Sequence, residues 1–119
     1  MKVTGSATMF PVSDLDASLR FFVEVLGFSE DFRFGKYAGI KKGECCIHLS
    51  AFGNPNTGKP GSACIYIFCD EVDQFYREIT ELGAVTDGPP KDYEYGMRDF
   101  IARDLDRNQI SFGTPTGGA

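Results

Sequence analysis

Residues 12–28 read VSDLDASLRFFVEVLGF, and this stretch decides the fold class. Its apolar residues recur at intervals of three and four, a spacing that lines one face of a helix. Ser13 or Asp14 can cap the start of this helix by accepting a bond from a free backbone N–H. Gly27 can end it, because glycine readily adopts the left-handed conformation that closes many helices. The stretch therefore predicts one capped helix, whose apolar face is Leu15, Leu19, Phe22, Val23 and Leu26.

Strands are predicted on both sides of this helix. Residues 6–12 precede it, and residues 28–34, 36–41 and 44–52 follow it as apolar or alternating runs bounded by turn formers. In the last run, alternation puts Cys45, Ile47 and Leu49 on one face of the sheet and Cys46, His48 and Ser50 on the other. His48 is therefore expected on a face with small polar side chains.

The same order of elements returns in the second half. Residues 53–61 are dense in glycine, proline and asparagine, as a connecting loop would be. A strand over 62–69, a helix opened by residues 70–73 and strands over 84–86, 98–103 and 109–112 follow. The predicted apolar face of this second helix is Val72, Phe75, Tyr76, Ile79 and Leu82. An offset of 56 residues places Asp14 on Asp70, Val23 on Ile79 and Gly27 on Gly83. The sequence thus predicts an α+β fold, in which two βαβββ modules form curved mixed sheets around a cleft.

Composition limits the function classes. A chain of 119 residues fits a single domain over residues 1–119, with module one at about 1–56 and module two at about 57–119. A formal net charge of −5 argues against a nucleic acid partner. No apolar run approaches the roughly 20 residues of a membrane helix, so no membrane partner and a cytoplasmic location are expected. The four cysteines lack CxxC spacing and are expected to be reduced thiols.

Residues 12–28 together with MRDFIARDLDRNQI at 97–110 resemble the glyoxalase/bleomycin resistance protein/dioxygenase superfamily, which has the vicinal oxygen chelate fold. Members of this family usually carry the signature Asp-Pro-Asp-Gly, and the corresponding residues here are Asp104-Leu105-Asp106-Arg107. The resemblance implies the two-module fold and a homodimer. It leaves open whether the modules pair within one chain or across the dimer. It does not fix the function, because the superfamily includes isomerases, dioxygenases, thiol transferases and binding proteins.

The resemblance also implies where a metal would be held in the enzymes of this family. The four ligand positions fall on Ala7, His48, Cys64 and Ser111. A methyl group cannot ligate, which leaves at most His48 and Cys64 as competent donors. A catalytic divalent site needs about three protein ligands. No metal, no cofactor and no catalytic residue are therefore expected.

Local detail is similar to the bleomycin-resistance proteins, which lack the metal ligands and sequester a bulky cationic drug. The similarity covers residues 32–45 and 75–77, and the tryptophans of the drug groove fall on Tyr37, Tyr95 and Ser62. We expect Tyr37 and Tyr95 to stack on a ligand by aromatic and cation–π contact. Polar contacts would come from His48, Asp99 and the acidic loop at residues 92–95. The full set of expected ligand-binding residues is Phe34, Tyr37, His48, Phe52, Ser62, Cys64, Tyr95, Asp99 and Ser111.

Three functions remain open at this point. The first is a metal-free protein that sequesters a small cationic or aromatic compound, with antibiotic resistance as one such role. The second is an enzyme, either a metal-dependent lyase or dioxygenase with a non-standard His48 and Cys64 site, or a metal-free isomerase or hydrolase with His48 as base. The third is a structural or regulatory dimer whose cleft is unused. Phe34 and Phe52 fit a groove wall and a dimer seam equally well.

Overall fold

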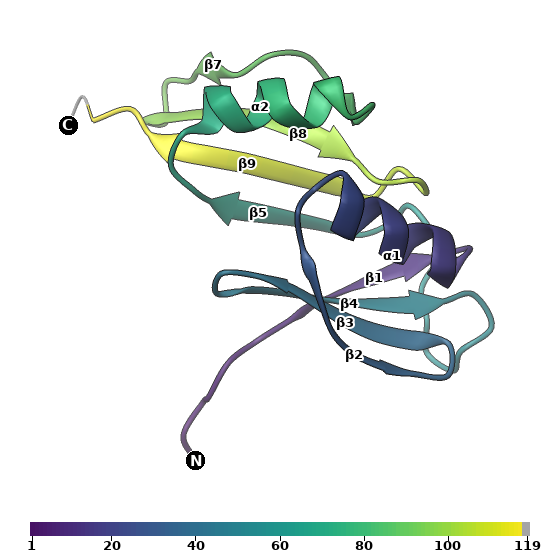
Figure 1. Ribbon diagram of the computed structural model, residues 1–119. Helices are drawn as coiled ribbons and strands as arrows, with labels where there is room; N and C mark the ends of the chain where they lie inside the picture. Colours follow the sequence, from purple (N-terminus) through teal and green to yellow (C-terminus); the bar gives the residue numbers. More distant parts are fainter. Residues whose placement is uncertain (118–119) are drawn as a thin grey trace.

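The chain folds into two similar modules, one after the other (Figure 1). The first has the order βαβββ, and the second has one strand more, because β6 and β7 both pair with β8 as β2 pairs with β3. The structure is a computed structural model that describes residues 1–117. Module one consists of β1 (Thr8–Val12), α1 (Leu15–Glu24), β2 (Ser29–Phe34), β3 (Tyr37–Lys42) and β4 (Cys45–Ala51). Module two consists of β5 (Cys64–Phe68), α2 (Val72–Glu81), β6 (Val85–Thr86), β7 (Lys91–Asp92), β8 (Met97–Arg103) and β9 (Gln109–Pro115). This mixed α+β architecture confirms the predicted fold class.

Each module forms one mixed sheet. The strand order is β1-β4-β3-β2 in module one and β5-β9-β8-β6 in module two, where β7 also pairs with β8. In both sheets the first strand is parallel to the last strand of its module, and the other pairs are antiparallel. Residues of β1 and β5 contact each other where the two sheets meet. The repeat of the sequence is therefore a repeat of topology.

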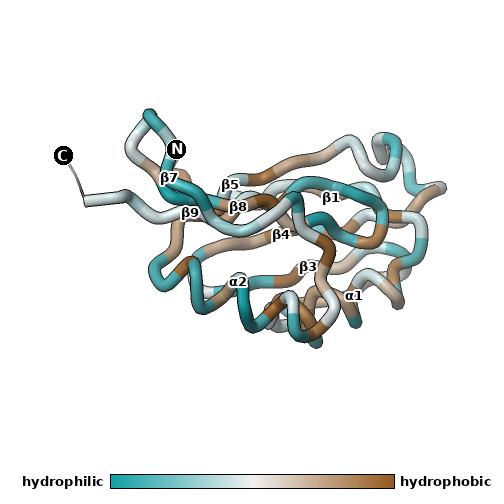
Figure 2. The backbone as a smooth tube through the Cα atoms, turned by 90° about the horizontal axis from the view of Figure 1, so that it is seen from above, coloured by the Kyte–Doolittle hydropathy of each residue, from teal (hydrophilic) through white to brown (hydrophobic). Residues whose placement is uncertain are grey.

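Both helices lie on the same side of the strands (Figure 2). The molecule measures 45 × 41 × 23 Å, and its radius of gyration of 14.7 Å exceeds the roughly 13.5 Å of a compact domain of this length. The chain is thus a plate made of one helix layer and one strand layer. We call the strand surface opposite the helices the open face. On β4 the predicted alternation is confirmed, because Ile47 and Leu49 are buried toward the helix layer while His48 is only partly buried.

The core lies between helices and strands. Phe10, Phe22 and Phe28 pack edge to face in module one, and Phe100 and Phe112 stack in module two. Two residues predicted on the apolar helix faces are instead exposed, Val23 at 40% and Leu82 at 59%.

Position on the helix explains these two errors. Val23 lies about 80° around α1 from Leu15, at the edge of the apolar face, and Leu82 is the C-cap residue just past the end of α2.

The repeat offset also differs within the helices. Helices α1 and α2 start at Leu15 and Val72, which are 57 residues apart, so the buried Ile79 corresponds to the buried Phe22 and not to Val23. Two residues separate the end of α1 from Gly27, whereas one residue separates the end of α2 from Gly83. The offset is therefore 57 within the helices and 56 at the two glycines.

The two helices start differently. The side chain of Asp14 accepts a bond of 3.1 Å from the backbone N–H of Ala17, so Asp14 is the cap of α1. Glu71 occupies the corresponding position of α2 with a φ of 45°, and its side chain makes no capping bond. Neither helix of the described residues is long and apolar enough to cross a membrane.

The turn between β8 and β9, residues 104–108, ties module two to module one. The amide nitrogen of Asn108 donates to the carbonyl oxygen of Pro11 at 2.9 Å and to the Asp104 carboxylate at 2.9 Å. Its amide oxygen accepts from the N–H of Ala63 at 3.0 Å. The Asp106 carboxylate accepts from the N–H and the hydroxyl of Ser13, at 3.1 and 2.6 Å. This turn therefore fixes both its own shape and the start of α1.

Candidate functional site

A buried carboxylate stands on the open face of module two. Asp99 of β8 is 7% exposed, and its Oδ2 accepts bonds from two tyrosine hydroxyls, Tyr66 at 2.8 Å and Tyr95 at 2.6 Å. The ring of Tyr66 lies flat over Gly113 of β9, where any Cβ atom would collide with it. A glycine at this position is thus what lets Tyr66 cross the sheet and reach Asp99.

Aromatic rings surround this carboxylate. Tyr93 stacks on Tyr95 with a centroid distance of 5.3 Å and an interplanar angle of 4°. Phe68, which is 75% exposed, lies 5.2 Å from Tyr66 between ring centroids. We call Tyr66, Phe68, Tyr93 and Tyr95 with Asp99 at their base the Asp99 cage.

The Asp99 cage is electrostatically suited to a cation. Lys91 is the cross-strand neighbour of Asp99, yet within residues 1–117 no basic group comes within 4.0 Å of the Asp99 carboxylate. A buried anion without a countercharge carries a desolvation cost that a bound cation would offset. The hydrogen bond to Asp99 raises the pKa of Tyr95 to about 12. The pKa of Tyr66 is also raised, mainly by burial and also by its hydrogen bond to Asp99. Both hydroxyls therefore remain donors at neutral pH.

These raised pKa values predict an alkaline titration. The pKa of a tyrosine is about 10 in the unfolded chain, and here it is higher in the folded chain. The protonated phenol therefore makes its full contribution to stability at pH values below about 10. This contribution is lost as the pH rises through the pKa of the folded state. We expect tyrosinate absorbance to show a late step near pH 12 for Tyr95, accompanied by falling stability above pH ~10. In the Asp99→Ala variant the late step should move toward the ordinary tyrosine value. A late step that stays in place would contradict the assignment.

A second group of polar and aromatic side chains lies on the open face of module one. The Tyr37 hydroxyl and Nδ1 of His48 share a hydrogen bond of 2.9 Å. The ring of Phe32 meets His48 edge to face at 5.1 Å and lies over Gly39, which leaves room for it. We call His48, Tyr37 and Phe32 the His48 cluster.

The other predicted ligand residues are more scattered. Phe34 is 84% exposed and is the cross-strand neighbour of Tyr37. Cys64 and Ser111 lie on strands β5 and β9, and Ser111 is opposite Tyr66. Phe52 lines a shallow hollow with residues 13–16 at the start of α1. Ser62 donates to the carbonyl of Lys59 at 2.6 Å within the connecting loop.

The structure thus joins Tyr37 to His48 and Tyr95 to Asp99, and it adds three aromatic residues that the sequence did not single out. Tyr66 and Phe68 share a strand face with Cys64, so the period-two alternation of β5 could have identified them. Phe32 could not be found in this way, because the register of β2 shifts between Glu30 and Phe32.

The acidic loop plays a different part from the one expected. Asp92 accepts a bond from Arg98 at 3.1 Å, and Arg98 also pairs with Asp73 at 2.7 Å. Consecutive residues of a strand point to opposite faces, so Arg98 lies on the helix side while Asp99 lies on the open face. Asp92 is therefore engaged in this ion-pair network, and the carboxylate of the cage is Asp99 alone.

The positions that hold a metal in the enzymes of the resembled family do not fit a divalent ion here. Ala7 offers no donor, and Ser111 offers a neutral hydroxyl that accepts a bond of 3.4 Å from Gln109. His48 is bonded to Tyr37 through Nδ1. No group of three or more His, Cys, Asp or Glu within residues 1–117 is arranged to hold a metal ion. We derive no chemistry through a metal at these positions.

The fold and the motifs agree with a known class of proteins. The family model described as Glyoxalase/Bleomycin resistance protein/Dioxygenase superfamily matches residues 6–112, so the chain belongs to this superfamily. It is 28% identical to the bleomycin resistance proteins of Geobacillus stearothermophilus and of Staphylococcus aureus, over 90% of this chain and 93% of theirs.

Solved structures show the same architecture. TioX from Micromonospora sp. ML1 superimposes with a TM-score of 0.84 at 22% identity, covering 95% of this chain and 99% of TioX. TnmS3, an antibiotic binding protein from Streptomyces sp. CB03234, gives a TM-score of 0.81 at 26% identity, covering 96% of this chain and 97% of TnmS3. The first likeness concerns the fold alone.

Proposed function

We propose that this chain is a metal-free binding protein that sequesters a small cationic, aromatic compound on its open face and breaks no bond in it. The observation that carries the proposal is Asp99, a buried carboxylate with two neutral donors, aromatic walls and no ion-pair partner in the described residues. The similarity to bleomycin resistance proteins and to an antibiotic binding protein supports an antibiotic as the compound.

The arrangement of the Asp99 cage indicates how such a ligand would be held. Both tyrosine hydroxyls bond Oδ2, so the other carboxylate oxygen of Asp99 is left to accept from a ligand N–H. A charged hydrogen bond of this kind contributes about 1.5–3 kcal/mol. The faces of Tyr95 and Phe68 add cation–π contacts of about 0.5–2 kcal/mol each. Binding of this kind needs no nucleophile and no general base.

The proposal includes a homodimer that acts in the cytoplasm. A plate only 23 Å thick leaves Phe34, Phe68 and Tyr95 exposed on its open face, and a second copy would shield them. All four cysteines are free thiols, in keeping with a reducing compartment. Light scattering after gel filtration is expected to give twice the chain mass of 13.1 kDa. A monomeric mass at micromolar concentration would contradict the dimer.

Bleomycin is the first ligand to test, followed by a panel of cationic aromatic antibiotics. Titration calorimetry should detect saturable binding, and mass spectrometry of the released ligand should find it unchanged. Failure of every member of the panel to bind would overturn the proposal. If the native chain converts a ligand to a product and the His48→Ala variant does not, the result would favour an enzyme instead.

Adding metal ions distinguishes the metal-free binding protein from a metal-dependent enzyme without the need for a ligand. A metal bound only by the folded state must raise the melting temperature. We expect Zn, Ni, Mn, Fe and Co to leave the melting temperature of the metal-stripped protein unchanged. A rise that His48→Ala abolishes would favour the metal-dependent lyase or dioxygenase.

A further inference from the structure

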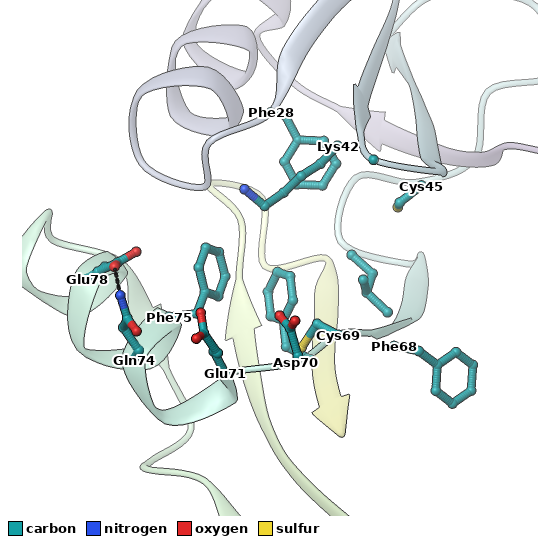
Figure 3. Close-up of a pocket in the computed structure, with 13 residues that line it drawn as sticks. Phe28, Lys42, Cys45, Phe68, Cys69, Asp70, Glu71, Gln74, Phe75 and Glu78 are labelled. Carbon is teal, nitrogen blue, oxygen red and sulfur yellow. Dashed lines mark hydrogen bonds between the residues drawn. The ribbon is translucent and has the colours of Figure 1, made fainter. Parts of the chain in front are cut away.

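A separate cavity of about 310 Å³ lies on the helix side of the plate, between the start of α2 and the β3–β4 turn (Figure 3). None of the nine predicted ligand residues lines it, and it shares only Phe68 with the Asp99 cage. The residues that determine its chemistry are Phe28, Lys42, Asp70, Glu71, Phe75 and Phe112.

Unequal turns account for this cavity. The start of α1 is covered by the five-residue β8–β9 turn, through the bonds of Asp106 to Ser13 and of Asn108 to Pro11. The start of α2 faces the β3–β4 turn of the other module, which is only Gly43 and Glu44. The shorter turn cannot reach across in the same way. The β8–β9 turn thus bonds to the segment before α1, whereas the cavity lies between the β3–β4 turn and the start of α2.

The walls of the cavity suit a flat apolar group. Phe75 is partly buried and presents its ring to the cavity, and this ring packs edge to face on Phe112 at 4.8 Å. Phe28 and Phe112, each 2% exposed, lie behind it. An apolar cavity of about 150 Å³ is large enough for benzene. This larger cavity therefore has room for a ligand with one or two rings.

The charges at the rim favour a cation. The ammonium of Lys42 lies 5.3 Å from the centroid of Phe75, so this ring face already accepts a positive charge. Lys42 is held only loosely, by a bond of 3.4 Å to the carbonyl oxygen of Gly27. Figure 3 shows the carboxylates of Asp70 and Glu71 on the side of the cavity opposite Lys42. With Glu78, which accepts from Gln74 at 3.0 Å, the rim has three carboxylates against one ammonium.

We propose that this cavity binds a small arylalkylamine. Its ring lies against Phe75, in front of the buried Phe28 and Phe112, and its ammonium group lies between the Phe75 face and the carboxylates of Asp70 and Glu71. The exposed side chain of Lys42 swings away to admit it. The site would operate whether or not the Asp99 cage binds a ligand.

Tryptamine is the probe, and two compounds with the same ring serve as controls: tryptophol, which is neutral, and indole-3-acetate, which is an anion. Chemical-shift perturbation in the full chain should rank tryptamine first and indole-3-acetate last, with shifts at residues 70–78. The absence of saturable shifts with tryptamine, or equal binding of the anion, overturns the proposal.

Three variants test the assigned roles. A double Asp70→Asn, Glu71→Gln variant should weaken tryptamine about tenfold or more and leave tryptophol unchanged. Lys42→Met should strengthen tryptamine, because it removes the competing ammonium and keeps the length of the side chain. Asp99→Asn should leave the tryptamine shifts at residues 70–78 unchanged, even though tryptamine is also the kind of cation proposed for the Asp99 cage. Loss of the shifts at residues 70–78 in Asp99→Asn, or an unchanged tryptamine affinity at these residues in the double variant, would overturn this site while leaving the proposed function of the open face untouched.

Discussion

Replacing Asn108 with alanine is expected to lower the free energy of unfolding by about 3 kcal/mol or more, since each unsatisfied buried polar group costs about 1–3 kcal/mol. Asn108 is fully buried, and its side chain bonds the Pro11 carbonyl, the Ala63 N–H and the Asp104 carboxylate. Alanine would leave all three without this partner. Burial already raises the pKa of Asp104, so losing a donor there adds to the cost. Urea unfolding curves measure the change.

Gln109→Ala is the matched control for this prediction. Gln109 is the next residue, it is half-buried, and its side chain makes one long bond of 3.4 Å to Ser111. We expect a change of roughly 0.5 kcal/mol, as for most sites away from a buried network. If Asn108→Ala were no worse than Gln109→Ala, the β8–β9 turn would not hold the modules together.

Asp99→Asn is expected to reduce the affinity for a cationic aromatic ligand about tenfold or more, the equivalent of at least about 1.4 kcal/mol. Asparagine keeps the size of the side chain and an oxygen that can accept from Tyr66 and Tyr95, but it removes the charge. Because the variant also removes a buried unpaired charge, its melting temperature should be unchanged or higher. Calorimetric titration with the ligand that binds the native chain measures the loss.

The control for this variant is Asp92→Asn, which removes one negative charge from the same region. Asp92 is exposed and pairs with Arg98 on the helix side, so its loss should leave the affinity nearly unchanged. Equal losses in the two variants would show that the ligand responds to net charge and not to the Asp99 cage.

The fold was largely predictable from the sequence because its signals are local. The cap at Asp14, the closing Gly27 and the alternation of residues 47–49 each act over a few residues, and the structure confirms all three. The error at Val23 and Leu82 arises at the edges of the two apolar faces. Each residue turns a helix by about 100°, so Val23 lies about 80° from Leu15, and Leu82 lies beyond the last residue of α2.

The candidate site was predictable only in part, because it depends on contacts between distant strands. Tyr95 and Asp99 were identified, but the partner that completes the cage, Tyr66, lies 33 residues away from Asp99 in the chain. Its position also requires Gly113 on the strand between them, a relation that no local pattern contains. The ion pairs of Arg98 were not predicted for a similar reason, because Asp73 and Arg98 meet only once α2 lies on its sheet.

The contrast between the two helix starts has a consequence for motion in the native state. The first turn of α1 is held by the Asp14 cap and by Ser13 on Asp106, whereas α2 begins at an uncapped Glu71 beside the cavity. Local opening should therefore be easier at α2, and its first-turn amides should exchange with deuterium well before those of α1. Although the two modules share one topology, we expect the first turn of α2 to open more often than the first turn of α1.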